Sequence, residues 1–492
     1  MRVPNLKRTH FILILLLFTS VFLRTQHLPS MWDGDIARDY LVAYHINKYQ
    51  EYPLVGHAAS GINFYYPPYY YYFLSVLMRF STNYFYLLLL FSLLNALSVL
   101  TVYGIGKLWF STKVGLIAAL LLMFSTPMTF MGRSSWSAHI IVPPFLFSFW
   151  LFSAFLKDHK QKILIISLSI LFLISFIHYS MTPYIFLFLS LAVATKNVSL
   201  QNAIRTAILI ICIFFLAQIP LIINFGLPKT VAKFSPQQNL LFTSRIIENF
   251  TSNIHHLFQL THNYNSHEIQ IITIALFLIT AFVLLKHRVL LKPLILFLPI
   301  TIFLPIFTSF KTGSIYGQFF TSSIPLIYIV YAYFIHLAFR VVKNTSTKVV
   351  FFFAVLFLIG YSAKDMYNLR WNTHYYEAFK NIADKINHDI GSFNFQLIVY
   401  DGKSFDWHNP AGWYFLEKRL DTKLLSVVNY GNNLKPQYSA DSIYLVCKTP
   451  FPEDIEDAHC KDTFSIEYPR YRIHSQLNIS YPDFSLYKYT KR

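Results

Sequence analysis

The sequence predicts an α-helical polytopic membrane protein with about eleven transmembrane helices and a carboxyl-terminal extracytoplasmic α/β domain. The first observation is composition. The 492 residues are 55% hydrophobic and 13% charged, whereas a soluble domain carries about a quarter charged residues. The second is that apolar runs long enough to cross a bilayer recur along residues 1–364. The third is that residues 365–492 are polar enough to form a soluble domain of ordinary size.

The apolar runs give the order of the predicted transmembrane helices. The candidate spans are 9–27, 84–106, 114–130, 138–156, 162–177, 180–195, 206–225, 269–285, 293–310, 319–339 and 349–363. The first has the basic start of a signal peptide, but no small-residue cleavage site follows it. We therefore interpret it as a span that is not cleaved.

Basic residues predict the orientation of these spans. Residues 1–364 hold 26 Lys and Arg against seven Asp and Glu, while residues 365–492 hold 15 against 16. Most of the excess falls in every second loop, which is typical of cytoplasmic loops. The amino terminus is therefore predicted to be cytoplasmic, with the loop 28–83 and the domain 365–492 on the opposite side of the cell membrane. The net charge of +18 thus indicates topology, and we expect no nucleic-acid partner.

The carboxyl-terminal domain shows alternating helix and strand patterns. Helices are predicted at His374–Ile390 and from Pro410 to Lys418, and strands at Gln396–Tyr400, at Ser442–Cys447 and once or twice within Phe464–Tyr489.

Three cysteines are too few for a disulfide framework. Cys212 lies inside a predicted span and is interpreted as a packing residue. Cys447 and Cys460 both lie in the extracytoplasmic domain, where oxidising conditions allow a disulfide between them. The sequence leaves open whether that bond forms.

Acidic residues cluster directly after the first span. Three of the seven in residues 1–364 are Asp33, Asp35 and Asp39, and a carboxylate beside a membrane is costly unless it is paired or hydrated. If a helix starts after Gly34, then Asp35, Arg38 and Asp39 share one face. Arg38 could hold a phosphate or fix a neighbouring carboxylate. The alternative is a capped helix start with surface charge, but the scarcity of acid elsewhere favours a catalytic site.

Further candidate residues occur along the predicted outer side. The loop 28–83 continues through His57 and Tyr66 into a tyrosine-rich run, which fits either a sugar-binding wall or an aromatic belt at the membrane interface. Short outer loops then carry Arg133 with Trp136, His178, and Lys311 with Tyr316. The basic residues are candidate contacts for a lipid phosphate, or interface anchors.

Several other function classes lack their motifs. The sequence has no phosphate-binding Gly-Lys-Ser/Thr loop, no His-Glu-x-x-His and no nucleophile elbow. The spans hold almost no ionisable residues, which disfavours an ion-coupled transporter. A lipid-linked glycan transporter and a glycan polymerase or ligase stay as alternatives. The second is supported by four histidines in the loop 226–268, namely His255, His256, His262 and His267.

The chain resembles the GT-C superfamily of membrane glycosyltransferases, in particular bacterial members of the branch of protein O-mannosyltransferases and aminoarabinose transferases. The resemblance covers about residues 8–364. Its motifs are Trp32–Asp39 after the first span, Pro53-Leu54-x-Gly56 leading into Gly61, Pro67–Tyr72, Arg133-x-x-Trp136 and His178-Tyr179.

The resemblance implies a function in the cell envelope, such as protein glycosylation. A sugar, hexose or pentose, would pass from a polyprenyl-phosphate donor to a hydroxyl acceptor (protein, lipid or glycan) at the outer face, with inversion at the sugar carbon. Asp35 matches the catalytic acid of the family's first outer loop, which makes the loop 28–83 catalytic. The family often pairs Asp with Glu there, and His57 stands where Pro is expected.

The resemblance and the chemistry together assign roles. Asp35 would act as the base, because a carboxylate can deprotonate an acceptor hydroxyl at contact distance. Arg38, Arg133 and Lys311 would stabilise the departing lipid phosphate. Asp33 and Asp39 would orient the acceptor, or hold a divalent metal ion together with Asp35. No cofactor is required by the sequence, and a metal ion stays open.

Overall fold

The computed structural model places the chain in two compact units. It describes residues 4–26, 28, 34–56, 58–59, 64–225, 245–262, 292–309, 320–341, 345–346, 348–349, 352–353, 360, 373–390, 395–400, 405–406, 410–420, 441–448, 460–461, 464–466, 470–477 and 484–491. The first unit, called the bundle unit, comprises Met1–Gln26, His57–Pro67 and Tyr86–Arg370. The second, called the mixed unit, comprises His27–Gly56, Pro68–Phe85 and Trp371–Arg492.

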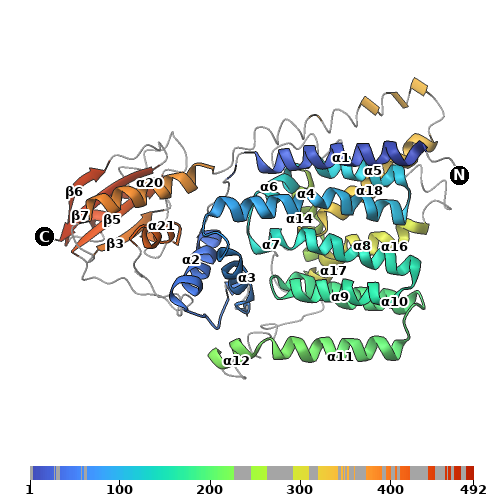
Figure 1. The fold of residues 1–492 in the computed structure, drawn as a ribbon, viewed down its shortest axis with the longest axis horizontal. Helices are drawn as coiled ribbons and strands as arrows, with labels where there is room; N and C mark the ends of the chain where they lie inside the picture. Colours follow the sequence, from blue (N-terminus) through green and yellow to red (C-terminus); the bar gives the residue numbers. More distant parts are fainter. Residues whose placement is uncertain are drawn as a thin grey trace. The chain divides into compact units, whose positions relative to one another are not determined.

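The bundle unit is built from helices that run side by side (Figure 1). They are α1 (Pro4–Thr25), α4 (Tyr84–Trp109), α5 (Thr112–Met123), α6 (Thr126–Gly132), α7 (Ser137–Ile140), α8 (Val142–Asp158), α9 (Gln161–Ser175), α10 (Thr182–Ala194), α11 (Leu200–Leu216), α12 (Ile219–Phe225), α14 (Arg245–His262), α16 (Lys292–Thr301), α17 (Phe303–Ser309) and α18 (Ile324–Val341). A 3₁₀ turn, Tyr179–Met181, precedes α10, and the short strands β1 (Ala58–Ala59) and β2 (Phe64–Tyr65) pair antiparallel.

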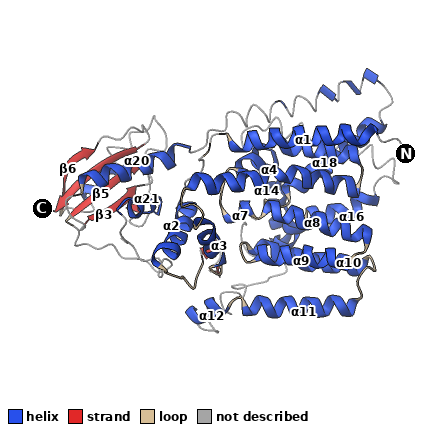
Figure 2. Cartoon of the chain, viewed as in Figure 1, coloured by secondary structure: helices blue, strands red, loops and turns tan. Residues whose placement is uncertain are grey.

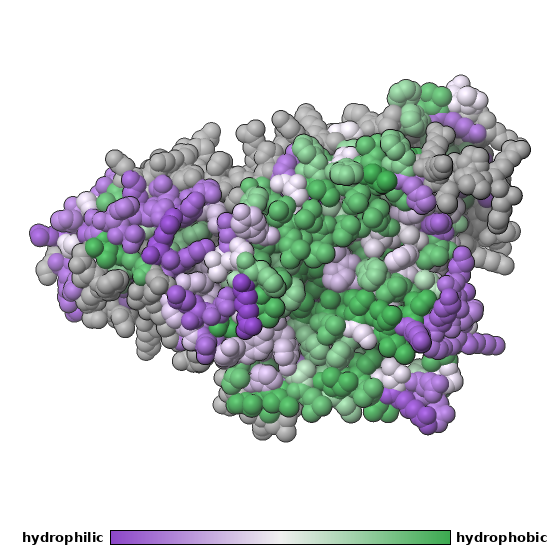
Figure 3. All heavy atoms as spheres, in the orientation of Figure 1, coloured by the Kyte–Doolittle hydropathy of each residue, from purple (hydrophilic) through white to green (hydrophobic). Residues whose placement is uncertain are grey.

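Two or three of the described helical segments have the length and apolarity to cross a membrane. Among the described residues, α4 and the continuous pair α7–α8 qualify, and the bent pair α5–α6 qualifies if it is one span. On the face seen in Figure 3, hydrophobic residues cover the sides of the bundle and hydrophilic ones gather at its end. The predicted span 269–285 and most of 349–363 lie outside the described residues. The predicted number of eleven spans therefore stays a prediction.

The predicted span 114–130 is broken in the structure. Helix α5 ends at Met123, and α6 starts at Thr126 after a bend of 66°. Ser125 caps α6 by accepting a hydrogen bond from the Met128 amide at 3.2 Å, and Pro127 follows at the start of the helix, where its missing amide proton costs nothing. Local cap chemistry therefore overrides the apolar continuity that predicts one helix.

Helices α4 and α5 approach closely through glycines. A Cβ atom added to Gly115 would lie 2.5 Å from the backbone oxygen of Tyr103, and one added to Gly106 would lie 2.8 Å from the Gly115 Cα. Small residues allow such backbone contact between membrane helices, where dispersion forces replace the hydrophobic effect as the driving force. The glycines therefore fix the crossing of α4 and α5.

The segment 226–268 was expected to be an outer loop, but part of it forms the helix α14. Its apolar side explains the difference, because Leu257 is buried in the core of the bundle unit and Asn253 is also buried. Of the four histidines considered for a polymerase or ligase, His255 is exposed on this helix. The side chains of His256, His262 and His267 lie outside the described residues.

The mixed unit combines two helices of the first outer loop with the carboxyl-terminal domain. Its elements are α2 (Gly34–Tyr49), α3 (Tyr69–Met78), α20 (Thr373–Asp389), β3 (Phe395–Tyr400), β4 (Phe405–Asp406), α21 (Pro410–Leu420), β5 (Ser442–Lys448), β6 (Tyr471–Leu477) and β7 (Phe484–Lys491). The described strands form one sheet in the order β4-β3-β5-β7-β6 (Figure 2). Strands β3 and β5 are parallel, because α21 lies between them in the chain, and the other pairs are antiparallel.

This arrangement confirms the predicted α/β domain. Helix α20 buries Phe379, Ile382 and Ile386, the apolar face that its sequence periodicity predicts, and Phe379 packs against Phe484 of β7 with ring centroids 5.5 Å apart. Cys447 of β5 forms a disulfide with Cys460, which the sequence left open. The predicted domain boundary at residue 364 lies outside the described residues.

Candidate active site

The acidic cluster after the first span starts the helix α2. The predicted face exists, since Gly34–Tyr49 is helical and includes Asp35 in its first turn. A carboxylate at this position interacts favourably with the positive end of the helix dipole. The opposite side of the helix is apolar and buried: Ile36, Ala37, Tyr40 and Leu41 are at most 1% exposed. Burial of this side fixes which way the charged face points.

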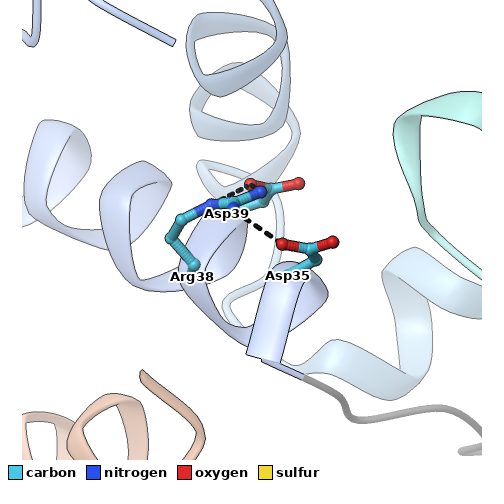
Figure 4. Close-up of polar contacts among 3 residues, drawn as sticks. All are labelled: Asp35, Arg38 and Asp39. Carbon is cyan, nitrogen blue, oxygen red and sulfur yellow. Dashed lines mark hydrogen bonds and ion pairs between the residues drawn. The ribbon is translucent and has the colours of Figure 1, made fainter. Parts of the chain in front are cut away.

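Arg38 lies between Asp35 and Asp39 and binds both carboxylates (Figure 4). Its Nη1 donates to Asp35 Oδ1 at 2.7 Å, while its Nε and Nη2 donate to Asp39 Oδ1 at 3.0 and 2.7 Å. Such charge-assisted bonds are short and directional. The guanidinium therefore fixes the two carboxylates relative to each other. Of the two roles considered for Arg38, binding a phosphate or fixing a carboxylate, this contact corresponds to the second.

The two carboxylates differ in exposure. The side chain of Asp39 is 1% exposed, whereas that of Asp35 is 48% exposed. In Figure 4 the second oxygen of Asp35 points away from Arg38. Asp39 is therefore placed to anchor the guanidinium, and Asp35 combines a fixed position with access for an incoming molecule.

The electrostatics around Arg38 favour a permanent cation. Burial opposes its charge, but Asp39, Tyr71 and Asp35 outweigh burial and raise the pKa of Arg38 above its ordinary value. Tyr71 of α3 hydrogen-bonds to Arg38, and burial raises the pKa of this phenol. Tyr71 therefore stays protonated and neutral at physiological pH.

Helix α2 is held by a buried histidine that no sequence motif indicates. His45 Nδ1 contacts Glu51 Oε2 at 2.9 Å, and His45 Nε2 makes a short contact with Glu417 of α21. His45 and Glu417 are completely buried, and Glu51 is 12% exposed. This cluster, called the histidine clasp, joins the helix that carries Asp35 to the carboxyl-terminal domain.

Tyrosines also pack between the first outer loop and the carboxyl-terminal domain. Tyr40 of α2 packs edge-on against Tyr84 at 4.9 Å and against Tyr414 of α21 at 6.4 Å. Tyr84 stacks on Tyr376 of α20 at 5.2 Å, and the Tyr414 hydroxyl donates to the Thr82 carbonyl at 2.8 Å. Tyr40 and Tyr84, which lie outside the predicted tyrosine-rich run, therefore pack the first outer loop against the domain, while Tyr70 and Tyr71 of the run itself are buried on α3.

In the bundle unit, Arg133 follows α6 and is buried. Its Nη2 donates to the Leu23 carbonyl near the end of α1 at 2.7 Å. Trp136 lies three residues on and packs edge-on against His139 at 5.1 Å. Arg133 is therefore placed where the first span ends.

Arg24 is a second buried arginine of this unit, which the sequence analysis did not single out. Its Nε donates to Asn95 Oδ1 at 2.7 Å, and its Nη1 donates to Ser20 Oγ at 2.8 Å. Its terminal nitrogens also reach the carbonyls of Leu122 and Met123 at the end of α5, at 3.1 and 3.5 Å. Arg24 thus donates to two carbonyls at the helix break, one of which, that of Leu122, also accepts a hydrogen bond from the Ser125 amide. A charged residue inside an apolar span was the available signal.

Two other predicted residues meet in the bundle unit. The Tyr66 ring lies 5.5 Å from that of His178 and stacks on Tyr179 at 4.8 Å. His178 Nδ1 contacts Ser180 Oγ at 2.7 Å, and burial lowers the pKa of His178 to about 3. His178 is therefore a neutral imidazole at physiological pH and provides no positive charge for a phosphate.

The remaining predicted site residues, Asp33, His57, Lys311 and Tyr316, lie outside the described residues, so their roles stay predictions.

A metal ion does not fit the described acids. Arg38 already takes the cationic position between Asp35 and Asp39, and the described residues contain no group of three His, Cys, Asp or Glu side chains suited to a metal.

Comparison with known proteins finds the fold of this chain among solved structures. No protein-family model matches the chain, and no curated protein matches it in sequence. Among solved structures, the chain is similar to ArnT from Cupriavidus metallidurans bound to undecaprenyl phosphate. The identity is 12%, the coverage is 99% of this chain and 98% of that one, and the TM-score is 0.52.

Two structures of an oligosaccharyltransferase from Archaeoglobus fulgidus also match. The apo form matches with 12% identity over 83% of this chain and 63% of that one. AglB in complex with an inhibitory peptide and a dolichol-phosphate matches with 10% identity over 99% and 74%. Both TM-scores are 0.37. On the full-length match, this chain has the fold seen in ArnT, which is the GT-C fold that the resemblance led us to expect.

Proposed function

We propose that the protein is a membrane glycosyltransferase that moves a sugar from a polyprenyl-phosphate donor to a hydroxyl acceptor on the extracytoplasmic side. The observation that carries the proposal is the half-exposed carboxylate of Asp35, fixed by Arg38 at the start of α2. It occurs on a GT-C fold, in a part of the chain with only seven acidic residues. The undecaprenyl phosphate bound to the matching ArnT structure supports a lipid-phosphate donor.

The proposed reaction is one displacement with inversion. The acceptor oxygen forms a bond to the sugar's anomeric carbon while the bond from that carbon to the phosphate oxygen breaks. The acceptor proton passes to the exposed oxygen of Asp35, and the bonding electron pair leaves with the polyprenyl phosphate. Arg38 donates directly to Asp35 and is itself anchored by Asp39, so it holds Asp35 in position. A positioned base of this kind contributes roughly 10²–10⁴-fold to a rate.

The departing phosphate needs positive charge. We assign this role to Arg133, the buried arginine at the end of α6, and to Lys311, as the sequence predicts. Arginine suits it because its guanidinium stays charged and can bind two phosphate oxygens. Arg38 is better suited to fixing Asp35, because its hydrogen bonds in Figure 4 go to carboxylates.

The test is Asp35→Asn in the full-length protein in membranes, supplied with a panel of labelled polyprenyl-phosphate hexoses and pentoses. Transfer of label to a hydroxyl acceptor should fall by about 10²–10⁴-fold, while donor binding should stay within a few-fold, because the amide keeps the shape of the side chain. Asp158→Asn is the matched control. It removes an exposed carboxylate from the same acid-poor part of the chain.

Two results would contradict the proposal. Undiminished transfer by Asp35→Asn would show that another group takes the proton. Transfer of the intact lipid-linked glycan across the bilayer, with no transfer to a hydroxyl, would indicate the transporter class instead.

A further inference from the structure

A second site lies at the other end of α5, between that helix and α18. A cavity of about 580 Å³ opens there. Its lining residues are Lys113, Leu116 and Ile117 of α5 and His336, Phe339 and Arg340 of α18. Nothing in the proposed transfer reaction uses these residues.

The charged part of the lining has one sign. Lys113 and Arg340 are exposed at their helix ends, and both act electrostatically on the His336 imidazole, so the three groups lie close together. Neither α5 nor α18 contains an acidic residue. Within the part of the chain that the structure describes, no carboxylate pairs with Lys113 or Arg340. The cavity therefore has charge complementary to an anion.

The rest of the lining is apolar and only partly buried. Leu116, Ile117 and Phe339 each keep part of their surface exposed within the cavity. A free inorganic anion gains nothing from such a wall. A phospholipid gains from both parts, because its phosphate meets the cations and its acyl chain meets the apolar residues. Basic pockets between transmembrane helices bind anionic headgroups in this way.

We propose that Lys113, His336 and Arg340 form a binding site for an anionic phospholipid of the leaflet next to these helix ends. That leaflet is the cytoplasmic one in the predicted topology, where anionic lipids are attracted by basic residues. The site is separate from the predicted donor phosphate site of the bundle unit, since Arg24 and Arg133 lie by the opposite end of α5. Twelve helical residues, about 18 Å, separate the two ends.

The experiment measures lipid binding to the purified full-length protein in zwitterionic phosphatidylcholine micelles. A fluorescent phosphatidylglycerol is titrated in, and its dissociation constant is measured. The double variant Lys113→Gln with Arg340→Gln should weaken binding by about 30-fold, from two headgroup contacts of ordinary strength. The reciprocal variant Lys113→Arg with Arg340→Lys keeps the charge and should restore binding. Restored binding also shows that the site tolerates substitution without unfolding.

The matched control is Lys157→Gln with Lys160→Gln, which removes the same charge from two exposed lysines of another predicted cytoplasmic loop. It should leave binding within about twofold of wild type.

The proposal is overturned if both double variants weaken binding equally, or if fluorescent phosphatidylcholine binds as tightly. Displacement by millimolar inorganic phosphate would indicate a site for a free anion, and preferential displacement by undecaprenyl phosphate would assign the site to the lipid carrier. Each of these outcomes also rejects the proposal.

Discussion

The histidine clasp gives the most direct test of how the outer loop is held. We expect Glu417→Gln to weaken the packing of α2 against α21, although the two side chains are nearly the same size. The variant leaves His45, completely buried, with one carboxylate partner in place of two. Weakening one hydrogen bond of a buried polar group costs about 1–3 kcal/mol. That cost corresponds to a roughly 5- to 150-fold increase in the population in which the two helices have separated.

Hydrogen exchange of backbone amides in the intact protein measures this opening. Amides of α2 and α21 should exchange faster in Glu417→Gln, whereas those of the bundle unit should be unchanged. Glu377→Gln is the control, because Glu377 is 43% exposed and pairs only at the surface with Lys380. A pair of this kind contributes at most about 1 kcal/mol. Equal exchange in the two variants would refute the assignment of the clasp.

A double-mutant cycle then isolates the pair. His45→Leu alone leaves the buried Glu417 carboxylate without its imidazole partner, so it should be costly. His45→Leu combined with Glu417→Met replaces the pair by apolar groups, and its cost should fall below the sum of the single costs. Because Asp35 lies on the same helix as His45, sugar transfer should decline with packing across this series.

Three further predictions concern the site and the packing. Arg38→Lys should lower transfer by up to about a hundredfold in single-turnover assays, since a lysine cannot hold both carboxylates with a planar fork; an unchanged rate would contradict the positioning role. Gly115→Ala places a Cβ 2.5 Å from the backbone of α4 and should cost about 1–3 kcal/mol in thermal unfolding, whereas Gly360→Ala meets nothing within 4 Å and should be neutral. Replacing Cys447 and Cys460 by Ser should cost about 2–4 kcal/mol, and a reducing agent should then have no further effect on unfolding.

Local patterns predicted much of the fold. The helix α20 and the strands β3 and β5 match their predicted segments closely, because amphipathic periodicity and short β-branched runs are local signals. The face formed by Asp35, Arg38 and Asp39 was also predictable, since it requires only the spacing of a helix. The sequence could not decide whether Arg38 binds a phosphate or fixes the neighbouring carboxylates, because that depends on which acceptors lie within reach.

Long-range contacts explain what the sequence did not predict. His45 and Glu417 are 372 residues apart, so no spacing rule connects them. Arg24 is a charged residue within the predicted span 9–27, but its role at the helix break depends on the carbonyls of a different helix. The helix α14 was missed because a polar, histidine-containing segment is typical of a loop. A local signal was nevertheless present, because apolar residues recur at helical spacing in this segment, at Ile247, Phe250, Ile254 and Leu257.

The acidic residues of the membrane part provide the last argument for Asp35. Asp39 is used in a buried ion pair with Arg38, and Glu51 contacts the buried imidazole of His45. Asp158 and Glu248 are exposed on α8 and α14, where the described structure gives them no salt bridge that would fix a carboxylate. A general base must be both accessible and held in place. Among the described acids of residues 1–364, Asp35 meets both conditions, because it is 48% exposed and bonded to Arg38 at 2.7 Å.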